Sequence, residues 1–139
     1  MILCFEEDSI KYIYDIILEN FMFLACHSNG LCVTKKVIAC SHNFDYIATV
    51  QKILLENANV LVQNSHGNYS IQVALESWDY EYVYPLINLF HNQFFTLSTQ
   101  KFSSNVVEKC LERGGEAVLA KFLDEICHKT KILGKNYFF

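Results

Sequence analysis

The sequence has 139 residues, of which 52% are hydrophobic and 14% aromatic, with one proline and five glycines. This composition excludes a disordered chain, a collagen-like chain and a loop-rich disulfide scaffold, and it favours helices. The net charge of −4, from 11 Lys and Arg against 15 Asp and Glu, excludes a protein that holds nucleic acid through bulk positive charge. If the chain binds RNA, a local surface must do so, and contacts to bases must matter more than contacts to phosphates.

The first predicted helix is the segment YIYDIILENF, residues 12–21. Its spacing of three and four residues places one apolar stripe on a helix, made of Ile13, Ile16, Ile17 and Phe21. The next helix contains VTKKVIA and follows HSNG, residues 27–30, where Ser28 and Asn29 are expected to accept hydrogen bonds from the first helical N–H groups.

Three further segments continue the helical pattern. HGNYSIQVALE, residues 66–76, follows the same kind of start in NSHG, residues 64–67, where Asn64 or Ser65 can accept the bonds. YVYPLINLF, residues 82–90, is expected to hold Pro85 in the first turn of a helix. FSSNVVEKCLE, residues 102–112, begins with Ser103 as an expected capping acceptor, and ERGGE after it predicts a helix stop and a restart.

These helices recur with one period. Leu24, Leu61 and Leu97 serve as anchors, 37 and 36 residues apart. Three other positions keep the same offsets from them: Ile17, Leu54 and Phe90 before the anchors, then Gly30, Gly67 and Ser103, then Ile38, Leu75 and Leu111. A further step reaches Ile126 and Leu133, so a partial fourth unit follows the third.

A unit of two or three short helices cannot bury its apolar face alone, so neighbouring units must stack. The sequence therefore predicts an all-α solenoid in one array over residues 1–139. The approximate units are 8–43, 44–80, 81–115 and a partial unit at 116–139.

The polar residues after Gly30, Gly67 and Ser103 vary while the apolar skeleton stays constant. Each unit places three of them on one helical face, at the first, second and fifth positions. We call each set a trio: Leu31, Cys32, Lys35; Asn68, Tyr69, Gln72; and Ser104, Asn105, Glu108. The pairs between them, including Val33 and Thr34, are expected to point mainly inward. A row of such trios could bind a single strand of nucleic acid, one base to each.

HGNYSIQVALE and FSSNVVEKCLE closely resemble the RNA-binding helices of Pumilio/FBF (PUF) repeats, and NGLCVTKKVI resembles a more diverged member. The resemblance implies a right-handed solenoid of three-helix repeats, similar to the fifth to seventh of eight, with the eighth begun. It implies that Asn68, Tyr69 and Gln72 bind uracil, with Tyr69 stacking on a base, and that Ser104, Asn105 and Glu108 bind guanine.

The hydrogen-bonding groups agree with this implication. A carboxylate only accepts, and guanine offers paired N1–H and N2–H donors, whereas an amide can match the mixed edge of uracil. The trio of Leu31, Cys32 and Lys35 departs from the family pattern, and the base opposite it stays open. In the family, the RNA runs antiparallel to the protein, so that the N-terminal repeats face its 3′ end. For this chain the resemblance therefore implies the order 5′-G-U-N-3′, within a UGU-type element in mRNA 3′ untranslated regions. It also implies repression or decay of the mRNA through protein partners on the convex face.

Several alternatives compete with this interpretation. A HEAT- or armadillo-like protein-interaction scaffold would also be helical and acidic. A zinc site from Cys26, His27, Cys32, Cys40 and His42 is disfavoured because the spacing matches no compact pattern, and Cys26 and Cys40 are interpreted as small core residues. No catalytic residue or cofactor is predicted, since no acid or glycine-rich turn accompanies a nucleophile. Trp78 is expected in the core rather than on a partner surface.

The segments near the two ends suggest a location and a possible self-association. Met1 is followed closely by acidic residues, and the six cysteines form no CxxC pair, so we expect free thiols in the cytoplasm. The longest apolar runs are too short to cross a membrane. The apolar ends of the array could associate with a second copy, with NYFF, residues 136–139, as the expected contact.

Overall fold

The computed structural model describes the backbone of residues 7–137 and the side chains of residues 9–134. This part of the chain contains helices and turns but no strand, which confirms the all-α class. In chain order the helices are α1 (Glu7–Glu19), α2 (Phe21–Ala25), α3 (Gly30–Cys40), α4 (Phe44–Gln63), α5 (Asn68–Ser77), α6 (Tyr80–Leu89), α7 (Phe94–Ser98) and α8 (Ser103–Tyr137).

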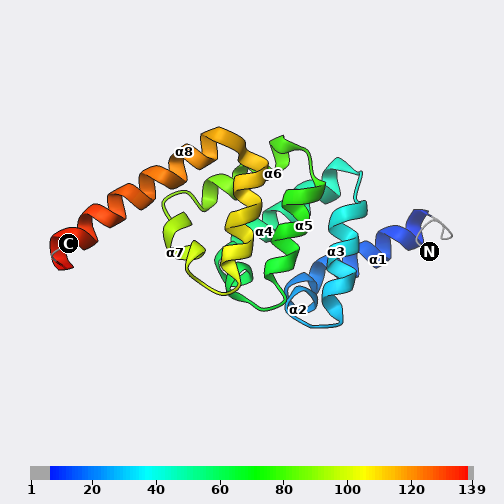
Figure 1. Cartoon of the computed structure of the whole chain (residues 1–139). Helices are drawn as coiled ribbons and strands as arrows, with labels where there is room; N and C mark the ends of the chain where they lie inside the picture. Colours follow the sequence, from blue (N-terminus) through cyan, green and yellow to red (C-terminus); the bar gives the residue numbers. More distant parts are fainter. Residues whose placement is uncertain (1–6, 138–139) are drawn as a thin grey trace.

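The helices form two layers. Helix α3 contacts α5, and α5 contacts the first part of α8, so these three lie side by side (Figure 1). We call α3, α5 and residues 103–114 of α8 the front layer. Helices α4 and α6 pack against each other behind it, and the short helices α2 and α7 join the layers. Each repeated unit thus supplies one helix to the front layer, and the predicted α-solenoid is confirmed.

The recurring spacing from anchor leucine to glycine has a steric cause. A Cβ atom added to Gly30 would lie 2.6 Å from the carbonyl oxygen of Leu24, and one added to Gly67 would lie 2.9 Å from a methyl group of Leu61. In the third unit the equivalent residue is Ser103, whose Oγ donates a hydrogen bond of 2.8 Å to the carbonyl of Leu97. Each front-layer helix therefore begins directly against its anchor leucine. The expected capping role of Ser103 is wrong, since this hydroxyl donates to the anchor carbonyl.

In the first two units, the turn before the front-layer helix is closed by the residue three positions after the anchor. His27 Nδ1 accepts hydrogen bonds from the backbone N–H groups of Asn29 and Gly30, at 3.1 and 3.3 Å. Asn64 Oδ1 accepts from the two equivalent N–H groups at 2.9 and 2.8 Å. Asn64 is the acceptor that was predicted, but the N–H groups that it binds belong to His66 and Gly67 in the turn before α5 and not to the helix itself. The capping prediction is wrong for Ser28 and Asn29, because His27 is the acceptor in that turn.

Pro85 and Gly115 mark two irregular places in the helices. Pro85 is the sixth residue of α6, so its predicted place in the first turn is wrong. It removes one helical N–H, and the carbonyl that loses this donor belongs to Glu81, which is exposed to water. Gly115 has φ 62° and ψ −149°, which interrupts α8 between residues 103–114 and 116–137. The predicted stop and restart at ERGGE is therefore confirmed, and α8 bends there in Figure 1.

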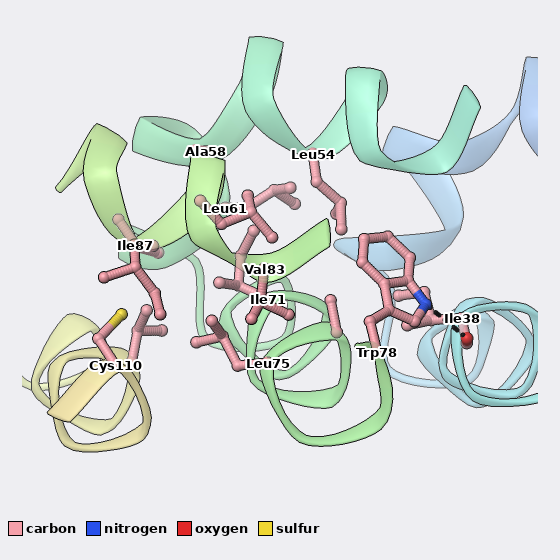
Figure 2. Packing of buried hydrophobic residues seen from close by; sticks show 14 of the residues in the cluster. Ile38, Leu54, Ala58, Leu61, Ile71, Leu75, Trp78, Val83, Ile87 and Cys110 are labelled. Carbon is pink, nitrogen blue, oxygen red and sulfur yellow. Dashed lines mark hydrogen bonds between the residues drawn. The ribbon is translucent and has the colours of Figure 1, made fainter. Parts of the chain in front are cut away.

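The core runs continuously through the stacked units. Figure 2 shows Leu54 and Leu61 of α4 close to Ile71 and Leu75 of α5, all four fully buried. Burying a leucine or isoleucine side chain stabilises the fold by about 1.5–3 kcal/mol. Trp78 is also buried, and its Nε1 donates to the carbonyl of Ile38 at 3.0 Å, as the dashed line in Figure 2 marks. Its predicted core position is confirmed, and it ties the second unit to the first.

Three expected core positions differ in the structure. Ile13 and Ile16 are exposed, because α1 turns Tyr14 towards the core instead, whereas Phe21 of the same predicted stripe is buried at the start of α2. Cys40, at the end of α3, is also exposed rather than packed. The predicted contact of residues 136–139 with a second copy concerns side chains outside the described range.

Candidate nucleic-acid interface

The trio positions share one side of the front layer. In α5, Ile71 and Leu75 are fully buried against the back layer, while Tyr69 on the opposite face is 44% exposed. The residues equivalent to Tyr69 in the other two units, Cys32 and Asn105, are exposed as well. Because the three helices lie side by side, their exposed faces form one surface on the side away from α4 and α6.

The second trio is held by hydrogen bonds within the protein. The side chain of Asn68 is only 1% exposed, and its Nδ2 donates to the carbonyls of Asn64 at 2.8 Å and Ser65 at 3.2 Å. Its Oδ1 accepts from Gln72 Nε2 at 2.8 Å. The buried Asn68 amide therefore orients the Gln72 side chain, and Gln72 Oε1 stays free to accept a hydrogen bond. The exposed ring of Tyr69 lies on the same helix face. Of the two amides predicted to contact uracil, only Gln72 is accessible in this structure.

The third trio has fewer internal bonds. Ser104 Oγ donates to the carbonyl of Lys101 at 3.3 Å, which is a weak bond. Asn105 and Glu108 are exposed, and the described residues give Glu108 neither an ion pair nor a hydrogen bond. Val106 and Val107 between them are buried, as predicted. Both carboxylate oxygens of Glu108 are thus available to accept from a pair of donors.

The first trio is the most open. Leu31 is half-buried, while Cys32 and Lys35 are exposed. Thr34 points inward and donates to the carbonyl of Leu31 at 3.0 Å, but Val33 is 39% exposed, so the prediction that Val33 points inward is wrong. This unit offers one cation and no aromatic ring or amide.

An ion-pair cluster joins the second and third units beside the trios. Lys109 Nζ lies 2.9 Å from a carboxylate oxygen of Glu76 and 3.3 Å from one of Glu112. The hydrogen bond with Glu76, followed by that with Glu112, raises the pKa of Lys109 above its ordinary value. Lys109 therefore stays charged and links α5 to α8.

Sequence reasoning missed several residues that hold the front layer in place. Gln100 stands at the position of His27 and Asn64 in the third unit, and its Oε1 lies 3.0 Å from Ser103 Oγ, whose hydrogen is shared with the carbonyl of Leu97. Arg113 Nη2 donates to the carbonyl of Trp78 at 2.6 Å. Glu125 accepts from the backbone N–H of Phe95 at 3.2 Å. This polar position could have been found, because it recurs three residues after each anchor, but the two longer-range contacts show no local pattern.

Other kinds of site find no support in the described residues. Among residues whose side chains are placed, no group of three or more His, Cys, Asp or Glu comes together in a way that could hold a metal ion. The helices of the described part are also too short or too polar for any to cross a membrane. The five described cysteines, Cys26, Cys32, Cys40, Cys110 and Cys127, are free thiols.

Comparison with known families matches the same helices. The model of the Pumilio-family RNA-binding repeat matches residues 57–90 and 93–127, which contain the second and third trios. A Pumilio domain-containing protein of Schizosaccharomyces pombe is 30% identical over 96% of this chain and 20% of its own length. Pumilio homolog 12 of Arabidopsis thaliana is 29% identical over 88% of this chain and 20% of its own length. The chain thus spans about a fifth of these relatives.

Solved structures agree with the architecture. PUF-8 in complex with PBE-RNA has a TM-score of 0.78 and 25% identity, and the match covers 91% of this chain and 37% of that one. The RNA-binding domain of yeast Puf5p bound to SMX2 RNA has a TM-score of 0.69 and 25% identity, over 98% of this chain and 41% of that one. The Puf4 RNA-binding domain, at 17% identity, has a TM-score of 0.78, which shows the shared fold.

Proposed function

Because the chain belongs to the Pumilio family of RNA-binding repeat proteins, we propose that it binds single-stranded RNA sequence-specifically, with one base opposite each front-layer helix. The observation that carries this proposal is the contrast between trios on equivalent positions. One presents a bonded pair of amides beside an exposed tyrosine, and the next presents an unpaired carboxylate. A purely structural layer would not need polar groups of such different hydrogen-bonding character on the face that leaves the core.

The third unit is proposed to bind guanine. Glu108 can accept from N1–H and N2–H of guanine at once, and no other base presents two adjacent donors with that spacing. Its carboxylate is exposed and unpaired among the described side chains, so no internal bond must break when the base arrives. Asn105 lies at the stacking position, and Ser104 borders the base edge.

The second unit is proposed to bind uracil. Gln72 uses its Nε2 on Asn68 and keeps an acceptor for the single N3–H of uracil. Tyr69 is exposed beside it and can stack on a base face, which is worth ~1–3 kcal/mol per base. Asn68 reaches the base edge only if its own amide turns away from Asn64, so Gln72 provides the first contact.

The proposed RNA strand contains 5′-G-U-N-3′. The nucleotide N, whose base is not assigned, lies opposite Lys35, and the 3′ end of the strand points towards the N-terminus of the protein. This order corresponds to a UGU-type element of the kind expected in mRNA 3′ untranslated regions. The proposed biological role is repression or decay of such an mRNA in the cytoplasm, with protein partners on the back-layer side. The free thiols of the described cysteines suit a reducing compartment.

The expected affinity of this chain alone is low. Stacking on Tyr69 contributes ~1–3 kcal/mol per base, and hydrogen-bonded base edges add ~1–3 kcal/mol of discrimination. The cost of association is ~4–15 kcal/mol, so three units give at most weak binding, and a longer array is needed for tight binding.

The test compares a UGU-containing RNA with the same RNA carrying UCU, by fluorescence anisotropy at high protein concentration. The native chain should bind the UGU strand about 5- to 160-fold more tightly, which corresponds to ~1–3 kcal/mol. Glu108→Gln should lose most of this ratio. Glu112→Gln removes the same charge one turn further along α8, where the carboxylate is bound to Lys109, and should keep the ratio.

A second candidate function is a helical-repeat scaffold that binds protein without contact to bases. The acidic net charge and the diverged first trio favour this second candidate. Equal affinity of the native chain for the UGU and UCU strands, in this chain and in a longer array, would favour the scaffold and refute base recognition.

A further inference from the structure

A hollow of about 420 Å³ lies between α3 and the C-terminal half of α5. It is lined on the α3 side by Cys32, Lys35, Lys36 and Ala39, and on the α5 side by Val73, Glu76 and Ser77. Cys32 and Lys35 also belong to the first trio. The hollow therefore opens onto the same surface as the trios, next to the proposed path of the RNA.

The hollow exists because side chains at this junction are short. The junction between α5 and α8 has longer residues at the equivalent positions, offset by one repeat. There Tyr69, Glu76, Lys109 and Arg113 stand where Cys32, Ala39, Val73 and Ser77 stand at the junction between α3 and α5. Glu76 and Lys109 meet at 2.9 Å and fill their junction, whereas Ala39 and Val73 leave theirs open.

The charges around the hollow are mostly positive. Lys35 and Lys36 are exposed, and neither forms an ion pair with any described residue. Glu76 is the acidic residue that lines the hollow, but its carboxylate is held by Lys109 on the far side of α5. At the next junction the positions of Lys35 and Lys36 are occupied by Gln72 and Val73, which carry no charge. Both cations on this side are thus specific to the first junction.

We propose that this hollow binds a backbone phosphate of the RNA strand, held by Lys35 and Lys36. The inference rests on the proposed function, since it assigns a second role to the same surface. An ammonium group is a compact donor that suits a phosphate oxygen and selects no base, because every base offers some acceptor. Leu31 adds no hydrogen-bonding group and Cys32 adds no ring. The first unit therefore contributes affinity without sequence preference, which compensates locally for the acidic chain.

The salt dependence of binding tests the proposal. For single-stranded nucleic acid, each phosphate contact adds about −0.7 to the slope of log K against log salt concentration. Because one phosphate is bound, the double variant Lys35→Gln/Lys36→Gln should reduce the magnitude of the slope by about 0.7. The control Lys11→Gln/Lys52→Gln removes the same charge from α1 and α4, where both side chains are exposed, and should change the slope much less.

Base preference is measured in the same titrations, with UGUN strands in which N is A, C, G or U. The native chain should bind the four strands within about twofold, and the double variant should weaken all four equally while keeping the ratio of UGU to UCU binding. An unchanged slope, an equal loss in the control, or a new preference at N would each overturn the phosphate site.

The two proposals fail in different ways. If UGU and UCU strands bind equally but the double variant still lowers the slope, base recognition is wrong and the phosphate site stands. If the ratio persists without a slope change, the reverse holds. If no strand binds even at low salt, both proposals are refuted.

Discussion

Replacing Asn68 with alanine tests whether this residue supports the fold as well as the RNA surface. Its amide makes two bonds to the carbonyls of Asn64 and Ser65 and accepts one from Gln72. Each bond contributes ~0.5–1.5 kcal/mol net, but the carbonyl of Asn64 keeps a bond from the backbone N–H of residue 68. The expected loss of stability is therefore about 1–3 kcal/mol.

The equivalent residue in the third unit provides a matched control. Ser104 stands at the same position of its trio, is partly exposed, and makes one long bond of 3.3 Å. Ser104→Ala should change stability by less than about 0.5 kcal/mol. Both variants remove a polar side chain from the first turn of a front-layer helix, so they differ mainly in burial and in the number of bonds lost.

Thermal and urea denaturation without RNA, followed by circular dichroism at 222 nm, measures both variants. For a chain of this size, Asn68→Ala should lower the Tm by roughly 3–12 °C, while Ser104→Ala should leave it nearly unchanged. Equal stability of the two variants would refute the reasoning, because burial and internal bonding of the Asn68 amide would then carry no free energy. RNA binding is compared at a temperature well below both transitions, where the fold of each variant is intact.

Two further predictions concern stability. Gly115→Ala should destabilise the protein by about 1–3 kcal/mol, because residue 115 has φ 62° and ψ −149°. The control Gly134→Ala should be neutral or slightly stabilising, because the space around its Cβ position is open. Equal effects of the two substitutions in urea denaturation would contradict this reasoning. Burial raises the pKa of Cys110 to about 12 from 9.0, so the unfolded chain ionises first and the free energy of unfolding should fall by about 1.4 kcal/mol per pH unit between these values. Cys110→Ala should remove that part of the slope, and an unchanged slope would show that the thiol is not the cause.

The repeat and its front layer could be predicted from the sequence because they depend on local order. In each unit, six residues separate the anchor leucine from the small residue before the trio. In the second unit the contact between Leu61 and Gly67 fixes where α5 begins. The 3.6-residue period then decides that Tyr69 and Gln72 lie opposite Ile71 and Leu75, whatever the neighbouring units contain. The same local rules predicted the interruption at Gly115.

Tertiary structure alone decided how much of each trio is available. Asn68 and Ser104 occupy equivalent positions, yet the first is 1% exposed and fully bonded while the second is partly exposed. His27 rather than Ser28 closes its turn, since only the folded turn brings the imidazole under the N–H groups. Periodicity specifies which face a residue occupies, but not which partners its side chain reaches.

The hollow beside Lys35 illustrates the same division. Its volume depends on two helices together, because Ala39 of α3 and Val73 of α5 must both be short for space to remain between them. At the next junction Glu76 and Lys109 have opposite charges and meet, so the space closes. Whether facing side chains fill a junction or leave it open depends on their combined length and charge across the contact between units. The sequence determined the repeated helices and their outward faces, and only packing between units determined the spaces and bonds on that surface.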